Sequence, residues 1–474
     1  MATIHGINVT ELDTALTTPN VAESGIPFIV GIAPVHSAAD PAAAGTPVLI
    51  TSWTEAVEKL GYFSSAKWGT YTLCEAMFTQ FQLYGAGPVI FLNLLDPATH
   101  KSAVAATAKT VSNHRVSLPG DAIVDSDLSV KYNNNDLTKG TDFEAFYSGN
   151  YLRIELLSTG SAYAATSLTI GYNKISTTGI NAAAVATAFE KVELCLTTLG
   201  VMPDMLLAPG FSHSSTVAAA MAAKAASING MFKAVALVDI DSSSATTYSA
   251  AVTQKSTDNL TDDFQIACWP MCKLGTNLFH LSCHIAGVMC STDAGNEGIP
   301  YESPSNKRIQ IDSLYLADGT TEVLLTKTQA DTLNAAGIMT AINFINGWVA
   351  WGNYMACYPD NTDVKDYFIP NRRMFNWVAN TEVMTFWGEI DRPMTRRLVD
   401  SILNSVEIWM SGLVASEYLL GARVEFIEDE NPDTNLAAGK IKLHNYLTPP
   451  GPMQELDFVL EYDASYITEA FSES

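Results

Sequence analysis

Segments typical of strands and of helices alternate over most of this chain, and that alternation limits the fold more than any other feature. Residues 28–33 form a short apolar run that ends at a proline, which is typical of a buried strand. Ser52 and Glu55 then have the spacing of a capping box that opens a helix, and residues 89–92 predict a second buried strand. Strands that alternate with helices form a sheet covered by helices, so we expect an α/β domain over residues 23–110.

A different pattern interrupts the α/β domain at residues 111–178. Short runs of alternating apolar and polar residues, such as residues 151–156, are separated there by clusters of Asn, Asp, Gly and Ser. Residues 132–136 are one such turn-rich cluster. We therefore predict an inserted all-β domain.

The alternation of helix and strand returns in residues 179–355. The expected segments are a helix at 182–198, a strand at 205–208, an alanine-rich helix at 216–229 and a strand at 234–239. This part and residues 23–110 are predicted to fold together as one α/β domain.

The two ends of the chain differ from this core. In residues 356–474, apolar residues from Leu398 to Leu413 recur at helical spacing, and strands are expected at 423–427, 440–447 and 455–462. In the last of these strands, Leu456, Phe458, Leu460 and Tyr462 alternate with polar or outward-facing residues, which predicts a half-buried strand.

The amino-terminal residues 1–22 are expected to form an extended arm. Ile7 and Val9 have strand spacing but no hairpin partner beside them, so this arm must pair with a distant segment or with another chain. The predicted fold class is thus a multidomain α/β and α+β protein with a carboxy-terminal α+β domain.

Composition excludes several functions. Among 474 residues, 47% are hydrophobic and 16% are charged, which suits a large buried core. The formal net charge of −24 disfavours binding to nucleic acid and to anionic membranes. We see no secretion signal, and no apolar run approaches the length of a membrane span. Seven scattered cysteines predict reduced thiols and a cytoplasmic folding compartment.

Motifs for catalysis or metal binding are not found in the sequence. The chain has no P-loop and no G-x-S-x-G elbow, and His213 has no identifiable partners for a catalytic triad. One apolar segment is rich in cysteine and histidine, but its spacing is irregular for zinc and favours buried thiols. That segment contains Cys268, Cys272, His280, Cys283, His284 and Cys290. We therefore predict no catalytic residue, no metal and no cofactor.

A basic cluster precedes the long carboxy-terminal helix. Arg392, Arg396 and Arg397 lie near its amino terminus, with Arg372 and Arg373 a little upstream. Cations there oppose the helix dipole, so either an acidic partner surface or local carboxylates must offset them. Local candidates are Glu389, Asp391 and Asp400.

Three parts of the chain resemble one known family. The amino-terminal part is residues 25–34, GIPFIVGIAP, and the middle part is residues 286–307, which include AGVM, GIP and SPSNK. The carboxy-terminal part runs from YFIPNRRMFNW at 367–377 through TFW at 385–387 and GARVEF at 421–426 to LDFVLEY at 456–462. In this order they are similar to the contractile tail sheath proteins of phages and phage-tail-like particles.

The resemblance implies a structural protein without enzymatic activity. Sheath subunits surround an inner tail tube as stacked rings, and contraction drives the tube through the target envelope. The expected partners are further copies of this chain, the inner tube protein, and baseplate and tail terminator proteins. Assembly is expected in the host cytoplasm, followed by residence in a virion tail or a released tail-like particle.

The family also implies that terminal arms complete the carboxy-terminal sheet of neighbouring subunits. The residues expected to take part in this strand exchange are Ile4, Ile7, Val9, Leu456, Phe458, Leu460 and Tyr462. Residues 15–20 and 448–452 are expected to act as flexible linkers. We further expect Arg392, Arg396 and Arg397 to face the tube.

Two alternatives remain at this point. One is an α/β hydrolase or transferase, whose site would lie in the loops after Ala208 or Asp239, because such sites lie at strand ends. The other is a different structural protein of the tail, such as a baseplate component.

Overall fold

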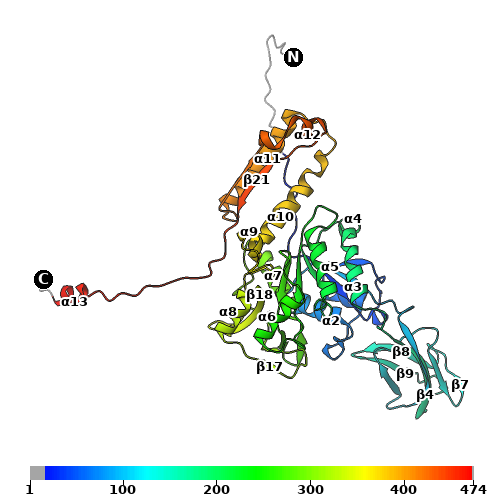
Figure 1. Cartoon of the computed structure of the whole chain (residues 1–474). Coiled ribbons are helices and arrows are strands. Elements are labelled where there is room, and N and C mark those ends of the chain that lie inside the picture. The colour runs from blue at the N-terminus through cyan, green and yellow to red at the C-terminus, as the bar shows by residue number, and fades with distance from the viewer. Residues whose placement is uncertain (1–16, 472–474) are drawn as a thin grey trace, which may run out of the picture.

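A central sheet of eight strands organises the computed structural model, which describes residues 17–471 (Figure 1). The strands follow the order β19-β18-β13-β12-β11-β1-β3-β2. Their bounds are β1 (Pro27–Gly31), β2 (Pro47–Ile50), β3 (Val89–Asn93), β11 (Met205–Leu207), β12 (Val235–Asp239), β13 (Gln265–Cys268), β18 (Ile338–Phe344) and β19 (Gly347–Trp351). The six strands from β3 to β18 are parallel, and β2 and β19 are antiparallel edges.

Helices cover both faces of the sheet, since every residue of β1, β3, β11, β12 and β13 is buried. The helices are α1 (Trp53–Leu60), α2 (Thr72–Met77), α3 (Ala182–Ala188), α4 (Cys195–Leu199), α5 (Ser215–Ala226), α6 (Tyr248–Thr257), α7 (Leu281–Gly295) and α8 (Lys327–Ala335). Short helical turns are η1 (Val35–Ser37), η2 (Ser65–Lys67), η3 (Phe78–Leu83) and η4 (Phe189–Leu194).

The start of α1 agrees with its predicted cap. The Ser52 hydroxyl accepts a hydrogen bond from the Glu55 amide, as expected. The Glu55 carboxylate returns to the amide of Thr51 rather than to Ser52. By contrast, the single helix expected at 182–198 is divided, because the 3-10 turn η4 separates α3 from α4.

Seven strands between β3 and α3 form two further sheets, at the lower right of Figure 1. They are β4 (Lys101–Thr110), β5 (Arg115–Pro119), β6 (Ser129–Tyr132), β7 (Asn135–Asp136), β8 (Phe143–Ser148), β9 (Tyr151–Leu156) and β10 (Ser167–Ile175). Asn133 and Asn134 have positive φ and join β6 to β7, which is the geometry of a two-residue hairpin turn. These strands share a core of their own, and β4 begins at Lys101, ten residues before the predicted insertion.

A small antiparallel sheet lies over the carboxyl end of β13. It contains β14 (Met271–Leu274), β15 (Asn277–Phe279), β16 (Ser313–Tyr315) and β17 (Glu322–Val323). The confirmed fold class is therefore a mixed α and β protein with several sheets.

The carboxy-terminal part rises above the central sheet (Figure 1). It comprises α9 (Val364–Tyr367), α10 (Ile369–Phe386), η5 (Trp387–Glu389), α11 (Arg396–Ala415), β20 (Gly421–Glu425), η6 (Glu428–Glu430), α12 (Asp433–Ala437), β21 (His444–Thr448) and α13 (Ser465–Phe471). The strand expected at 440–447 begins only at His444, because Asn431 binds both backbone groups of Lys442 and holds the chain away from the sheet.

Candidate assembly interface

The carboxy-terminal part has its own apolar core, built where α10 meets α11. Trp377 and Met374 of α10 pack with Val406, Met410 and Leu413 of α11. The predicted helical spacing on α11 is correct, since this stripe faces α10. By length and composition, α11 could also cross a membrane, contrary to our expectation from the sequence. Its apolar stripe is instead covered by α10.

The first described residues of the chain lie along α10 and α11. Thr17 donates its amide to Ser405 Oγ at 3.0 Å, and Asn20 donates to Thr385 Oγ1 at 2.9 Å. The Trp377 indole donates to the Ala22 carbonyl at 2.8 Å. The described part of the expected linker 15–20 is therefore bound to the helices. Ile4, Ile7 and Val9 lie outside the described residues.

A buried ion triad joins α10 to the central domain. The Arg373 guanidinium lies 2.9 Å from Asp293 Oδ1 and 2.7 Å from Asp204 Oδ2. Burial alone would lower the pKa of Arg373, but the two carboxylates outweigh it and raise that pKa. Asp204 also accepts the amide of Ile26 at 2.8 Å, so the triad fixes the entry to β1 as well.

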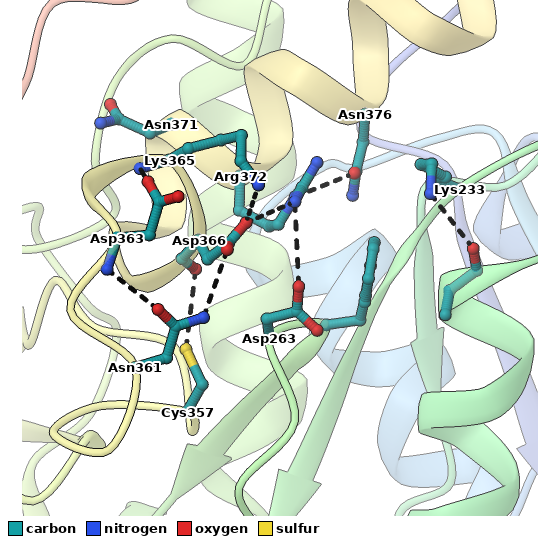
Figure 2. A network of polar contacts seen from close by, with 12 residues as sticks. Lys233, Asp263, Cys357, Asn361, Asp363, Lys365, Asp366, Asn371, Arg372 and Asn376 are labelled. Atoms are coloured by element: carbon teal, nitrogen blue, oxygen red, sulfur yellow. Dashed lines mark hydrogen bonds and ion pairs between the residues drawn. The ribbon is translucent and has the colours of Figure 1, made fainter.

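A second network surrounds the neighbouring arginine (Figure 2). Arg372 donates to Asp366 Oδ1 at 2.8 Å and to Asn376 Oδ1 at 3.2 Å, and it approaches Asp263 at 3.9 Å. Burial would raise the pKa of Asp366, but hydrogen bonds from Lys365 and Asn361 and the charge of Arg372 lower it. Arg372 and Arg373 therefore do not belong to the basic surface cluster.

The sequence contained a signal for these networks that we did not use. Two adjacent arginines stand inside an apolar helical segment at 369–378. A buried arginine needs carboxylate partners, so acidic residues such as Asp204 and Asp293 could have been sought in the core. Their distance in the sequence hides the pairing.

The basic cluster lies at the exposed start of α11. Arg392 pairs with Glu389, and Arg396 Nε lies 2.9 Å from Asp400 Oδ1. These are the local partners that the sequence offered as one alternative. Arg397 is exposed and has no ion-pair partner within residues 17–471. The exposed apolar side chains of Trp387, Ile390 and Met394 lie in the segment between α10 and α11. Sequence periodicity did not predict this apolar cluster.

The carboxy-terminal arm, residues 449–463, leaves the body of the protein as an extended chain (Figure 1). The prediction of a half-buried strand at 455–462 is wrong within a single copy. The side chains of Leu456, Phe458, Leu460 and Tyr462 are 61, 80, 94 and 78% exposed. The physical reason is that no strand of the described chain lies beside them, so the apolar side has nothing to cover it.

A groove runs beside the two-stranded sheet of β20 and β21. Gly421 pairs with Thr448 and Glu425 with His444, so within the described chain each strand has one open edge. A cavity of about 490 Å³ lies between this sheet and Phe375 of α10. Open edges present unpaired N–H and C=O groups to a further strand.

The cysteine- and histidine-rich segment is part of the core. Cys268, Cys272, Cys283 and Cys290 are buried free thiols, and burial raises the pKa of each. Within residues 17–471, no three His, Cys, Asp or Glu side chains converge as metal ligands would. Burial lowers the pKa of His284 to about 3, so its ring is neutral and packs against Tyr84.

The loops that an enzyme of this fold would use do line a cavity, but they hold no pair of nucleophile and base. Ser212 and Ser282 both donate to Asp239 Oδ2, at 2.9 and 2.6 Å. The His280 ring binds Glu75 instead, with Nδ1 2.9 Å from Oε2. No hydroxyl–imidazole contact therefore exists there among the described residues, and such a contact is what activates a serine.

The described chain thus combines a mixed α and β body with an exposed apolar arm and a two-stranded sheet whose outer edges are open. The chain is a homologue of tail sheath proteins. It is 25% identical over 489 aligned residues to the tail sheath protein of Burkholderia phage BcepMu, and the alignment covers 98% of each chain. No family model matches the chain.

Solved structures give the same result for the fold. The chain is similar to the sheath of the extracellular contractile injection system PVC in its contracted state, with a TM-score of 0.59, 14% identity and coverage of 98% of this chain and 99% of that one. It is also similar to the contracted helical sheath of the anti-feeding prophage, with a TM-score of 0.58, 15% identity and coverage of 98% and 100%. The resemblance to contractile sheaths is confirmed, and the enzyme alternative is not supported.

Proposed function

We propose that this chain polymerises around an inner tail tube and contracts to drive that tube through the envelope of a target cell. The observation that carries the proposal is the exposed apolar arm. The arm extends away from the rest of a chain that is homologous to sheath subunits over nearly its whole length. A chain that exposes several large apolar side chains in sequence gains free energy when another molecule covers them.

In this proposal the arm of one subunit binds the groove of a neighbouring subunit, and we call this intersubunit contact the joint. The segment with Leu456, Phe458, Leu460 and Tyr462 adds as a strand to the open edge of β20 or β21 in a neighbouring copy. The amino-terminal arm, with Ile4, Ile7 and Val9, adds to the same sheet from another neighbour. Main-chain hydrogen bonds supply affinity in such strand addition, and alternate side chains supply register.

The basic cluster of Arg392, Arg396 and Arg397 faces the tube in the assembled sheath. Three features support this: the cluster is exposed, Arg397 lacks an ion-pair partner in the described part of the chain, and apolar side chains stand beside it. An acidic surface on the tube would offset the cost of cations at the amino terminus of α11.

The wider context follows from the same role. Baseplate and tail terminator proteins bind the two ends of the sheath, assembly takes place in the host cytoplasm, and the product is a virion tail or a tail-like particle. Residues 23–110 and 179–355 act as one domain, 111–178 as an insertion, and 356–474 as the unit that carries the joint.

Deletion of residues 1–15 tests the joint. The shortened protein should remain a folded, soluble monomer and should build no tubes, because one strand donor is missing. Circular dichroism and thermal unfolding check the fold, and negative-stain electron microscopy checks assembly. Normal tubes from the shortened protein would refute the role of the amino-terminal arm.

Charge reversal tests the face toward the tube. The triple variant R392E/R396E/R397E should lose extended sheath on purified tubes. A variant with Lys131, Lys139 and Lys174 changed to Glu has the same net charge, but its changes lie in the β-rich insertion, and it should assemble normally. Equal assembly of the two variants on tubes would reject the assignment.

A further inference from the structure

A cavity of about 540 Å³ opens at the carboxyl ends of the central parallel strands. Its wall includes Ile32 after β1, Phe211 after β11, Asp241 after β12 and Met271 after β13. The strand order reverses between β1 and β11, since β1 also pairs with β3. Sheets of this kind bind ligands in the crevice at such a reversal.

The loop geometry keeps this space open. Gly210 has φ +77°, and a Cβ at this position would lie 2.8 Å from Thr72 Cγ2. A side chain there would be strained and would also crowd the wall of the cavity. The chain therefore turns tightly past the cavity rather than filling it.

The charged groups in the wall sum to a negative site. Glu75 and His280 form a buried ion pair whose charges cancel. Burial would raise the pKa of Asp241, but hydrogen bonds from Ser243 and Ser244 outweigh it and lower that pKa. Asp241 therefore remains a carboxylate, and His213 lies near it. Asp239 stands two residues earlier, at the end of β12, where it accepts hydrogen bonds from Ser212 and Ser282.

A buried hydroxyl in the same wall lacks a partner. Ser242 is 3% exposed, and its Oγ has no hydrogen-bond partner among residues 17–471. Buried polar groups in folded proteins are nearly always paired, with a bound ligand or water as the remaining option. The cavity also has apolar walls, which include Trp68 and Leu278.

We propose that this cavity binds a small organic cation, an alkylammonium or guanidinium group, between Asp239, Asp241 and Ser242. The carboxylates attract the charge, the hydroxyl completes the polar shell, and the apolar walls cover the carbon stem. The absence of three convergent metal ligands in the described chain argues for an organic cation rather than a metal ion. The cation is either a free amine or a lysine or arginine side chain of another protein.

Calorimetric titration of the full chain at about 150 mM salt tests this site, because such salt screens binding that arises only from net charge. The probes are 1,5-diaminopentane and N-acetyl-lysine methylamide, with pentanol as the neutral control and pentanoate as the anionic control. We expect one cation to bind per chain, and neither control to bind. Tighter binding of the diamine indicates a free amine, and tighter binding of the capped lysine indicates a protein side chain.

Variants distinguish binding in the cavity from binding to acidic groups elsewhere on the surface. Asp241→Asn keeps the turn but removes the charge, and Ser242→Leu fills the cavity; each should weaken binding about tenfold or more. Asp142→Asn is the matched control, since Asp142 likewise accepts hydrogen bonds from the amide and hydroxyl of one serine, Ser161, but lies in the β-rich insertion. This variant should bind as the wild type does. Thermal unfolding confirms that each variant is folded.

Two results would overturn the site. One is no binding of either cation by the wild type, and the other is equal weakening by Asp142→Asn and Asp241→Asn. Neither result bears on sheath assembly, so failure here is distinguishable from failure of the proposed function.

Discussion

Arg372 and Arg373 are adjacent in the sequence, yet their guanidinium groups bind different carboxylates. Arg372 faces Asp366, which is only six positions away on α9, whereas Arg373 reaches Asp204 and Asp293 in the central domain. One turn of α10 therefore stabilises its own amino terminus and its attachment to the rest of the molecule. Buried pairs of this kind are costly to break, because the remaining partner keeps its charge without compensation.

Replacement of Arg373 by methionine should lower the free energy of unfolding by about 3–5 kcal/mol. Methionine replaces the aliphatic stem of arginine but leaves Asp204 and Asp293 buried without a cation. Urea unfolding followed by circular dichroism measures the loss. Arg423→Met is the control, because Arg423 pairs with Glu425 at the exposed sheet, and its loss should cost about 1 kcal/mol or less. Equal effects of the two changes would contradict the assigned role.

His280 makes the stability of the central domain depend on pH. Burial alone would lower the pKa of this histidine, but the charge and hydrogen bonds of Glu75 outweigh burial and raise the pKa from 6.5 to about 9. A histidine with a raised pKa stabilises the folded state fully below 6.5, and this stabilisation is lost as pH rises through 9. The contribution is on the order of 3 kcal/mol.

The variant H280Q should therefore flatten the pH dependence of stability. Between pH 6 and pH 10, the free energy of unfolding of the wild type should fall relative to that of H280Q. Both proteins contain the same titrating lysines, tyrosines and cysteines. The difference between their free energies of unfolding therefore cancels the contribution of those groups. Urea unfolding at one-unit pH intervals measures it. A constant difference over this range would show that Glu75 and His280 do not form a charged pair.

At the scale of elements, local patterns predicted most of the central sheet. Short apolar runs gave β1, β3, β11 and β12, because strands buried on both faces need no alternation. The spacing of apolar residues also predicted α11. Boundaries were less accurate where a local contact intervenes, as at η4 and before β21.

The carboxy-terminal arm shows why pattern alone is not sufficient. Its alternation is that of a half-buried strand, but nothing in one copy of the chain covers it. A sequence pattern records that an apolar side is to be buried and does not record which molecule buries it. The same limit applies to the interface as a whole, because the cluster of exposed apolar side chains near Arg392 has no periodicity.

Alternation along the arm gives a sharp test of strand addition. If residues 455–462 pair as a strand with one side buried in the neighbour, Phe458 and Leu460 face inward and Val459 faces outward. The variants F458D and L460D should then abolish assembly, whereas V459D should assemble.

All three positions are more than three-quarters exposed in the free subunit. None of these changes should therefore alter the free energy of unfolding by more than about 0.5 kcal/mol. Electron microscopy and sedimentation measure assembly. Equal loss of assembly in all three variants would indicate that the arm contacts the neighbouring subunit without a fixed strand register.

At the scale of the whole molecule, the three largest apolar cores are joined by contacts of specific chemistry. The central core, the core of the β-rich strands and the core between α10 and α11 are distinct. The ion triad of Arg373 and the docked residues 17–22 connect the last of these to the first. Contacts between residues so far apart in the sequence have no local signature, which is why they could not be predicted.

Net charge adds a constraint that acts on every copy at once. Each subunit carries a formal charge of −24, so copies that approach one another during assembly repel. The screening length falls from about 30 Å at 10 mM salt to about 8 Å at 150 mM. We therefore expect the critical concentration for polymerisation without tubes to fall over this range, as measured by sedimentation.

Assembly on tubes should respond less to salt, because screening also weakens the attraction between the basic cluster and an acidic tube surface. The comparison is between the critical concentrations with and without purified tubes at each salt concentration. In R392E/R396E/R397E the attraction is absent, so tubes should no longer lower the critical concentration. A critical concentration that rises with salt in the absence of tubes would mean that attraction between specific charges, rather than net repulsion, controls contact between subunits.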